Sequence, residues 1–200
     1  MKRFTAGGLV CLVAVVLLTP LALADEYVLD REHTSVTVSW DHLGMSRQSG
    51  RFTEVTGRVR FDPGRPEDAT VNVRIGVSSL STGVASLDRH LTQTSDFFDV
   101  AKYPDITFVS KSVALTTSRT ANVKGDLTIN GVTQPATLSV VWNYDGEHPL
   151  AKVNPTYSGV YAMGFSARTK ILRSQWGITR TIPLVSDELR IVIETEMLRR

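Results

Sequence analysis

The side chains that could carry acid–base or metal chemistry lie far apart in this 200-residue sequence. Its four histidines are His33, His42, His90 and His148. None belongs to a His-x-His or Glu-x-x-His pair, the spacings that bring two metal ligands onto one face of a strand or helix. The sequence also has neither a phosphate-binding glycine loop nor a nucleophile elbow. We therefore expect no catalytic residue, no metal and no cofactor.

One pair of carboxylates has a setting that could support chemistry. Asp96 and Asp99 flank the aromatic pair Phe97-Phe98, and two nearby acids can share general acid–base work. The same arrangement is explained more simply if the acids cap and solvate a buried aromatic pair. We therefore keep an enzyme as the weaker interpretation.

The Asp-Phe-Phe-Asp stretch lies in residues 81–110, where the hydrophobic period differs from that of a strand. Ser86 is a candidate N-cap, and Asp88 falls in the first helical turn. Tyr103-Pro104 must end any helix before the next strand begins. We predict one short helix here, lying across the mouth of the fold as a lid. The predicted lid residues are Leu87, Leu91, Phe97 and Phe98.

The rest of the chain alternates between apolar and polar side chains, as half-buried β-strands do. The expected strands are residues 27–40, 51–62, 70–77, 105–115, 120–129, 136–144, 160–171 and 187–197. Between two of them, Asn130-Gly131 favours a type I′ hairpin turn, because both residues accept a positive φ. Sequential antiparallel strands favour a closed barrel, since closure removes unpaired edges. The sequence therefore predicts an all-β, eight-stranded antiparallel barrel with the helix between the third and fourth strands.

A barrel of this size either fills its interior with side chains or holds one small ligand. Gly57, Gly125 and Ala167 are small residues at inward positions, which would leave room for a guest. A fully packed interior is the alternative.

The first 24 residues have the form of a cleaved secretory signal peptide. Lys2-Arg3 is basic, an apolar run covers residues 9–18, and Ala22-Leu23-Ala24 has the form of a cleavage site. A membrane anchor is the alternative, but the apolar run is short for a span and Thr19-Pro20 interrupts it. We expect residues 25–200 to form one exported domain without stable membrane insertion.

Removal of the signal peptide changes the charge and the cysteine content. The one cysteine, Cys11, would leave, and with it any disulfide or thiolate chemistry. Lys2 and Arg3 would leave too, so the 22 basic residues would fall to match the 20 acidic ones. A chain without net positive charge lacks the basic surface that a phosphate backbone demands, and we expect no nucleic-acid partner.

An apolar interior beneath a helix is the makeup of a hydrophobic-ligand carrier. Each buried methylene contributes about 0.8 kcal/mol, so a long apolar chain would be retained even after the costs of association. Two alternatives stay open: an enzyme that acts on a lipid ester or prenyl diphosphate in the same cavity, and a ligand-free stress protein with a packed barrel.

Several short blocks carry a family resemblance through their order and spacing. They are residues 29–30 with 35–36, HLGMS at 42–46, GRF at 50–52, DRHL at 88–91 with DFFDV at 96–100, YP at 103–104 with ITF at 106–108, GDLTI at 125–129, GVT at 131–133, GFSA at 164–167, RS at 173–174 with WG at 176–177, and VSDE at 185–188. Together they resemble the YceI-like polyisoprenoid-binding family over essentially the whole mature length. The chain departs from the pattern at Gln175-Trp176, where the family more often has an acid followed by Phe or Tyr.

The resemblance implies an extended, lipocalin-like barrel in the periplasm that holds an isoprenoid, quinone or other long-chain apolar lipid. It implies transport, storage or stress buffering rather than catalysis, and a homodimer is left open. The expected apolar lining is Val38, Trp40, Phe52, Val59, Val73, Ile75, Phe108, Leu127, Leu138, Val140, Trp142, Phe165, Ala167, Ile191 and Ile193. The candidate head-group contacts at the mouth are His42, Arg47, Arg51 and His90. An arginine would suit an anionic head group in particular.

Overall fold

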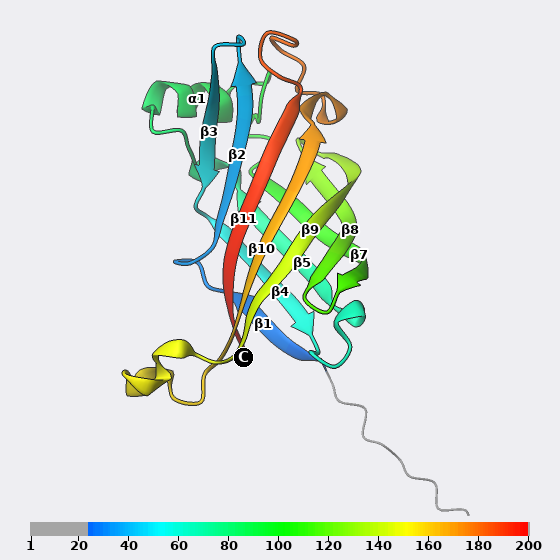
Figure 1. The fold of residues 1–200 in the computed structure, drawn as a ribbon. Helices are drawn as coiled ribbons and strands as arrows, with labels where there is room; N and C mark the ends of the chain where they lie inside the picture. The colour runs from blue at the N-terminus through cyan, green and yellow to red at the C-terminus, as the bar shows by residue number, and fades with distance from the viewer. Residues whose placement is uncertain (1–23, 200) are drawn as a thin grey trace, which may run out of the picture.

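The computed structural model describes residues 24–199, which form a closed antiparallel β-barrel (Figure 1). The barrel closes where the first strand, β1 (Asp25–Leu29), pairs with the last, β11 (Glu188–Arg199). The other strands are β2 (Ser35–His42), β3 (Ser46–Phe52), β4 (Val55–Phe61), β5 (Thr70–Gly76), β6 (Leu80–Ser81), β7 (Asp105–Thr117), β8 (Thr120–Ile129), β9 (Val132–Glu147) and β10 (Tyr161–Leu172). Short 3₁₀ helices lie in the connections: η1 (Pro66–Asp68), η2 (Val77–Ser79), η3 (Pro149–Lys152), η4 (Pro155–Tyr157) and η5 (Arg173–Trp176). The predicted all-β antiparallel barrel is confirmed.

The eleven strand segments make eight barrel positions, because three long strands are interrupted. Both β1 and β2 pair with β11, one after the other, so the expected strand 27–40 is a single position with a bend in it. The bend is polar, and the Asp30 carboxylate accepts a hydrogen bond from the Glu32 amide. β3 and β4 are likewise divided at residues 53–54, and η2 divides β5 from β6.

Within residues 24–199 there is one α-helix, α1 (Ala85–Gln93), and it lies between the third and fourth barrel positions, as predicted. It begins two residues earlier than expected: Val84 is the N-cap residue, and Ser86 lies inside the helix. The capping interaction comes instead from Asp88, whose carboxylate accepts hydrogen bonds from the amide and hydroxyl of Thr82, each at 2.6 Å. The prediction of Ser86 as the cap was therefore wrong, because the upstream Thr82 offers two donors to the first-turn acid.

The Asn130-Gly131 turn between β8 and β9 has the predicted conformation. Asn130 has φ +50° and Gly131 has φ +72°, and the strands pair directly from Ile129 and Val132 onward. This turn fixes the register of the β8–β9 hairpin. In that register Leu127 and Leu138 lie on the same inward face as Val140.

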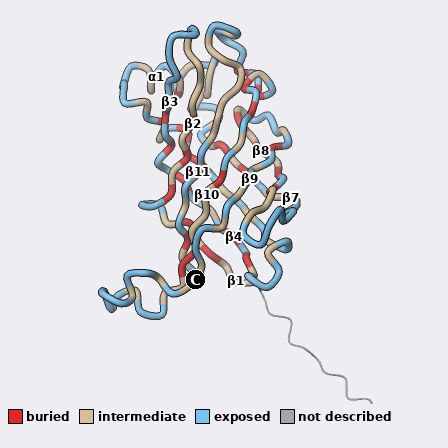
Figure 2. The backbone as a smooth tube through the Cα atoms, viewed as in Figure 1, coloured by how far each residue is buried: buried red, intermediate tan, exposed pale blue. Residues whose placement is uncertain are grey.

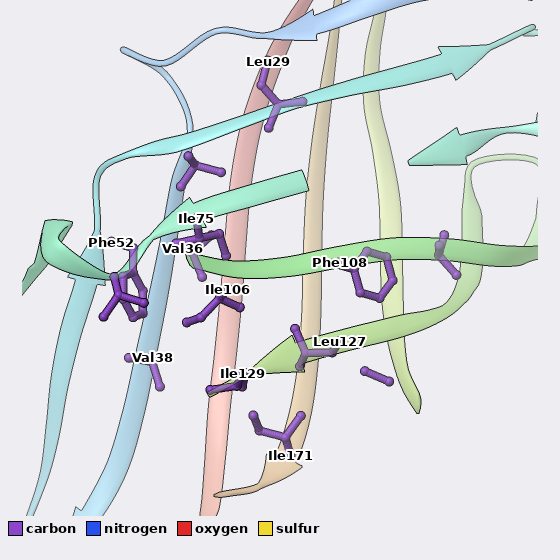
Figure 3. Close-up of a cluster of buried hydrophobic side chains, with 14 of the residues drawn as sticks. Leu29, Val36, Val38, Phe52, Ile75, Ile106, Phe108, Leu127, Ile129 and Ile171 are labelled. Atoms are coloured by element: carbon purple, nitrogen blue, oxygen red, sulfur yellow. The ribbon is translucent and has the colours of Figure 1, made fainter. Parts of the chain in front are cut away.

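Buried residues follow the barrel wall, whereas the connections at both ends of the barrel are exposed (Figure 2). Figure 3 shows apolar side chains from several strands, among them Val36, Phe108 and Ile171, converging on the interior. The glycines predicted to leave room have another role. A Cβ on Gly125 would lie 2.5 Å from the Phe108 ring, and one on Gly57 would lie 2.6 Å from the Asn72 carbonyl oxygen. The absence of a side chain at these two glycines allows neighbouring protein atoms to approach closely and does not enlarge the space for a ligand.

The predicted signal peptide, apart from its last residue, lies outside the described residues. Within residues 24–199, no helix has the length and apolar character needed to cross a membrane.

Candidate functional site

The interior of the barrel contains a cavity of about 230 Å³. Its wall is built almost entirely from apolar side chains that alternate along the strands. On β9 these are Leu138, Val140 and Trp142, while Ser139 and Val141 between them face outward. Because successive side chains of a strand point to opposite faces, one apolar stripe from each strand makes a continuous wall. The interior is therefore hollow rather than fully packed.

One end of the cavity is closed. Trp176 is 1% exposed, and its indole N–H donates to the Leu127 carbonyl oxygen at 3.1 Å. Phe98, from the segment after α1, packs edge-on against Phe52 with ring centroids 5.9 Å apart. With Ile178, these residues seal the end of the barrel where α1 lies (Figure 1).

Arg173 is a buried cation at the closed end, and its hydrogen-bond partners are neutral. Its Nε, Nη1 and Nη2 atoms donate to the carbonyl oxygens of Ser186, Ile178 and Val185, at 2.9, 3.1 and 3.0 Å. Burial lowers the pKa of its guanidinium, and the nearby Asp187 carboxylate opposes that effect. Arg173 therefore holds the β10–β11 connection in place, and these bonds occupy its three nitrogens.

The opposite end of the cavity is open. Leu115 on β7 belongs to the cavity wall and is nevertheless 45% exposed. The wall also reaches Ser118 and Arg119 in the β7–β8 turn, and Pro66 in η1. The β5–β7 ladder stops at the Asn72–Val109 pair, whereas β7 continues to Thr117 with pairing only to β8. The outer half of β7 thus extends beyond its pairing with β5, and η1 packs beside it at this end of the cavity.

The rim of the opening carries one ion pair beside an aromatic ring. The Arg119 Nη1 atom lies 3.1 Å from Asp145 Oδ1, and the guanidinium carbon lies 4.6 Å from the centroid of the Trp142 ring. The Arg119 carbonyl also accepts a hydrogen bond from the Trp142 amide. These contacts fix the guanidinium at the edge of the apolar wall.

A family model for the YceI-like domain matches residues 27–197. The chain belongs to the YceI-like domain family. A curated relative, the UPF0312 protein of Pseudomonas syringae pv. tomato, is 38% identical over 159 residues, which cover 78% of each chain.

Two solved structures share the YceI-like fold of this chain. BcnA of Burkholderia cenocepacia aligns with TM-score 0.73 and 24% identity, over 84% of this chain and 98% of that one. A polyisoprenoid binding domain from Saccharophagus degradans, implicated in plant cell wall breakdown, aligns with TM-score 0.61 and 12% identity, over 90% of this chain and all of the other. At these identities the likeness shows a common fold.

The predicted apolar lining falls mostly at the cavity wall of this YceI-like barrel. The wall includes Val38, Phe52, Val59, Val73, Ile75, Phe108, Leu127, Leu138, Val140, Trp142, Phe165, Ala167, Ile191 and Ile193. Trp40 is absent from the wall and packs, partly buried, against the hydrophobic core. Contact of these residues with a lipid stays a prediction.

The structure does not bring the four candidate head-group residues to the cavity. His42, Arg47, Arg51 and His90 all lie outside the cavity wall. Arg47 is paired with Asp41 at 3.0 Å near the tip of the β2–β3 hairpin, and the His90 ring packs against Phe97 on the outside of α1. These four residues lie at the closed end of the barrel or on its outer face, and none belongs to the wall near the opening.

The predicted lid residues cover the closed end. Leu91, Phe97 and Phe98 pack against the core, and of these Phe98 reaches the cavity wall. Leu87 is partly exposed on the helix. The segment thus closes one end of the barrel, and its role as a lid over a bound ligand stays a prediction. The mouth is at the other end because β7 outruns its pairing with β5.

Sequence reasoning missed Arg119, Leu115 and Arg173. Leu115 was visible as an apolar residue at the end of an expected strand, but nothing in the pattern marked that end as open. Arg119 stood in a short turn of ordinary polar residues.

One group of potential metal ligands in the described chain also escaped prediction. Asp30, His33 and Glu196 have ligand atoms within 4.8 Å of one another on the outside of the barrel. His33 Nδ1 is already hydrogen-bonded to Asp30 at 2.8 Å. The cluster forms because β11 brings Glu196 beside the β1–β2 bend.

Proposed function

We propose that this YceI-like protein is an exported carrier that holds a long-chain apolar lipid, such as an isoprenoid or a quinone, inside its barrel. The observation that carries the proposal is the apolar cavity with one open end. A closed end and an open end suit a molecule with an apolar tail and a more polar head. The tail would lie along the barrel and the head would remain at the opening.

The size and apolar lining of the cavity support a hydrocarbon guest. Apolar cavities of about 150 Å³ in other proteins stay dry and bind small hydrocarbons, and the volume here is larger, about 230 Å³. Each methylene that leaves water for such a cavity contributes about 0.8 kcal/mol. A tail of ten carbons would thus bring several kcal/mol, enough for tight retention after association costs.

The composition of the wall favours a carrier over an enzyme. Among the described residues that line the cavity there is no His, Cys, Lys, Asp, Glu or Tyr. The two arginines of the wall are poor proton donors or acceptors near neutral pH. A lipid inside the barrel would therefore meet no general base from these residues, and the Ser and Thr hydroxyls of the wall have none there to activate them.

Two further observations support the ligand class and the compartment. A solved protein with the same fold is described as a polyisoprenoid binding domain. The sequence of residues 1–24 has the form of a secretory signal, which suits a carrier that works in the periplasm.

The test is mass spectrometry of the protein expressed from its full sequence and purified from a periplasmic extract without detergent. We expect a co-purifying long-chain lipid in the native spectrum, released by solvent extraction. Ala121→Phe would fill the cavity and abolish that lipid. Ala114→Phe, an exposed change on the neighbouring strand, would leave it in place. A lipid-free protein that takes up neither added prenyl lipid nor quinone would overturn the proposal.

A further inference from the structure

The open end of the cavity has one ionisable side chain in its wall, that of Arg119. The other arginine of the wall, Arg173, is buried at the closed end with its three nitrogens bonded to carbonyl oxygens. A lipid whose tail occupies the barrel would therefore place its head group beside Arg119.

Arg119 is positioned and still has donors to offer. Its Nη1 atom pairs with Asp145, and its guanidinium lies over the Trp142 ring. Within residues 24–199, Nε and Nη2 of Arg119 have no hydrogen-bond partner. Ser118 and Thr120 add hydroxyl groups to the same part of the wall.

The charge around the opening argues against an anionic head group. Asp145 already compensates the charge of Arg119. On the other side of the opening, the η1 connection carries Glu67 and Asp68, and Arg65 there is paired with Asp62 and Asp68. A phosphate or diphosphate at the opening would be repelled by these carboxylates, and the charge of Arg119 is already balanced by Asp145. An uncharged carbonyl or hydroxyl would accept hydrogen bonds from Arg119 without disturbing the ion pair.

We propose that Arg119, held by Asp145 and Trp142, is the head-group contact of this carrier and selects lipids with an uncharged head group that accepts hydrogen bonds. The assignment rests on the proposed function, because it requires the lipid tail to lie in the barrel.

The test compares two probes that share one tail, farnesol and farnesyl diphosphate. Their binding is measured by displacement of N-phenylnaphthylamine from the delipidated protein. Arg119→Met removes the donors and keeps the aliphatic stem. Asp145→Asn removes the compensating charge. The matched controls are Arg47→Met and Asp41→Asn, which alter an ion pair of similar length away from the cavity; the two arginines are similarly exposed, and Asp41 is more exposed than Asp145.

We expect Arg119→Met to weaken farnesol binding about tenfold, since a hydrogen bond from a charged donor is lost. Asp145→Asn should strengthen farnesyl diphosphate binding about fivefold or more, because the Arg119 charge becomes available. Both controls should bind each probe within about twofold of the wild type. Thermal unfolding of every variant checks that it is folded.

The outcomes separate the two proposals. If the wild type binds both probes and the Arg119 variant matches the Arg47 control, the head-group assignment is wrong and the carrier function stands. If the wild type prefers the diphosphate, selection for an uncharged head group is wrong. If the wild type binds neither probe, the proposed function fails and the assignment fails with it.

Discussion

At the closed end of the barrel, Arg173 binds three carbonyl oxygens of its own connection and has no salt bridge within the described chain. Such a residue stabilises a loop that has too few donors of its own. The loop in turn carries Trp176 and Ile178, which seal the cavity.

We predict that Arg173→Met lowers the free energy of unfolding by about 3 kcal/mol, because three carbonyl oxygens lose their donor where little water can replace it. Urea denaturation measures this. Arg168→Met, an exposed change on β10, the strand that precedes Arg173, is the control and should change stability by less than about 0.5 kcal/mol. Equal stability of the two variants would show that the loop does not depend on Arg173.

His33 offers a pH-dependent contact on the outer surface. The hydrogen bond to Asp30 raises the pKa of the His33 imidazole, and the charges of Asp30 and Glu196 act in the same direction. Because the folded pKa lies above the unfolded one, the contact stabilises the fold fully below the unfolded pKa of about 6.5 and is lost as pH rises through the folded pKa.

We predict that Asp30→Asn lowers the pKa of His33, measured by titrating its imidazole signals by NMR. The stability difference between wild type and His33→Gln should be largest below about pH 6.5 and should shrink at higher pH. A difference that grows with pH would contradict this sign.

At the scale of elements, the β7–β8 hairpin determines where the barrel opens. In the inner half of the hairpin, β7 pairs with β5 and β8 pairs with β9. In the outer half, β8 still pairs with β9, but β7 has no strand partner other than β8. The Phe108 ring on β7 lies so close to Gly125 on β8 that a side chain at residue 125 would overlap it.

We predict that Gly125→Ala lowers the free energy of unfolding by about 2 kcal/mol, because the added methyl group would lie 2.5 Å from both the Phe108 ring and the Val109 carbonyl oxygen. Gly164→Ala is a close control on β10, since its methyl group would meet nothing nearer than 3.6 Å. That variant should be as stable as the wild type within about 0.5 kcal/mol. Thermal and urea unfolding of both variants would decide, and equal loss in the two would refute the close-packing argument.

At the scale of the whole molecule, the barrel presents an apolar inner wall and a polar outer surface on alternate residues. The function proposed above depends on that separation. Val140 belongs to the cavity wall, and the next residue, Val141, is 45% exposed on the outside.

We predict that Val140→Asp abolishes lipid retention and lowers stability by about 2 kcal/mol, because a carboxylate in an apolar wall lacks a partner. Val141→Asp should retain the lipid and change stability by less than about 0.5 kcal/mol. Native mass spectrometry and urea denaturation test the pair. Loss of lipid in both variants, or in neither, would show that the cavity wall is not the binding surface.

The sequence by itself determined most of the residues that face the interior, with Trp40 as an exception. Side chains of a strand alternate with a period of two, so the apolar stripe on β9 and the short turn at Asn130-Gly131 are sufficient to assign the inward face of this hairpin. The helix between the third and fourth barrel positions was also predictable, because its spacing broke that period.

The tertiary structure alone decided which end of the barrel is open and which polar residues lie there. The opening depends on where the pairing of β7 with β5 stops. The apolar–polar pattern of one strand does not show how many of its residues pair with the neighbouring strand. Arg119, Asp145 and Trp142 meet at the rim because the β7–β8 turn and the end of β9 converge in space. The basic residues that the sequence favoured lie on outward positions of strands or on the helix, where alternation and helix packing direct them away from the cavity.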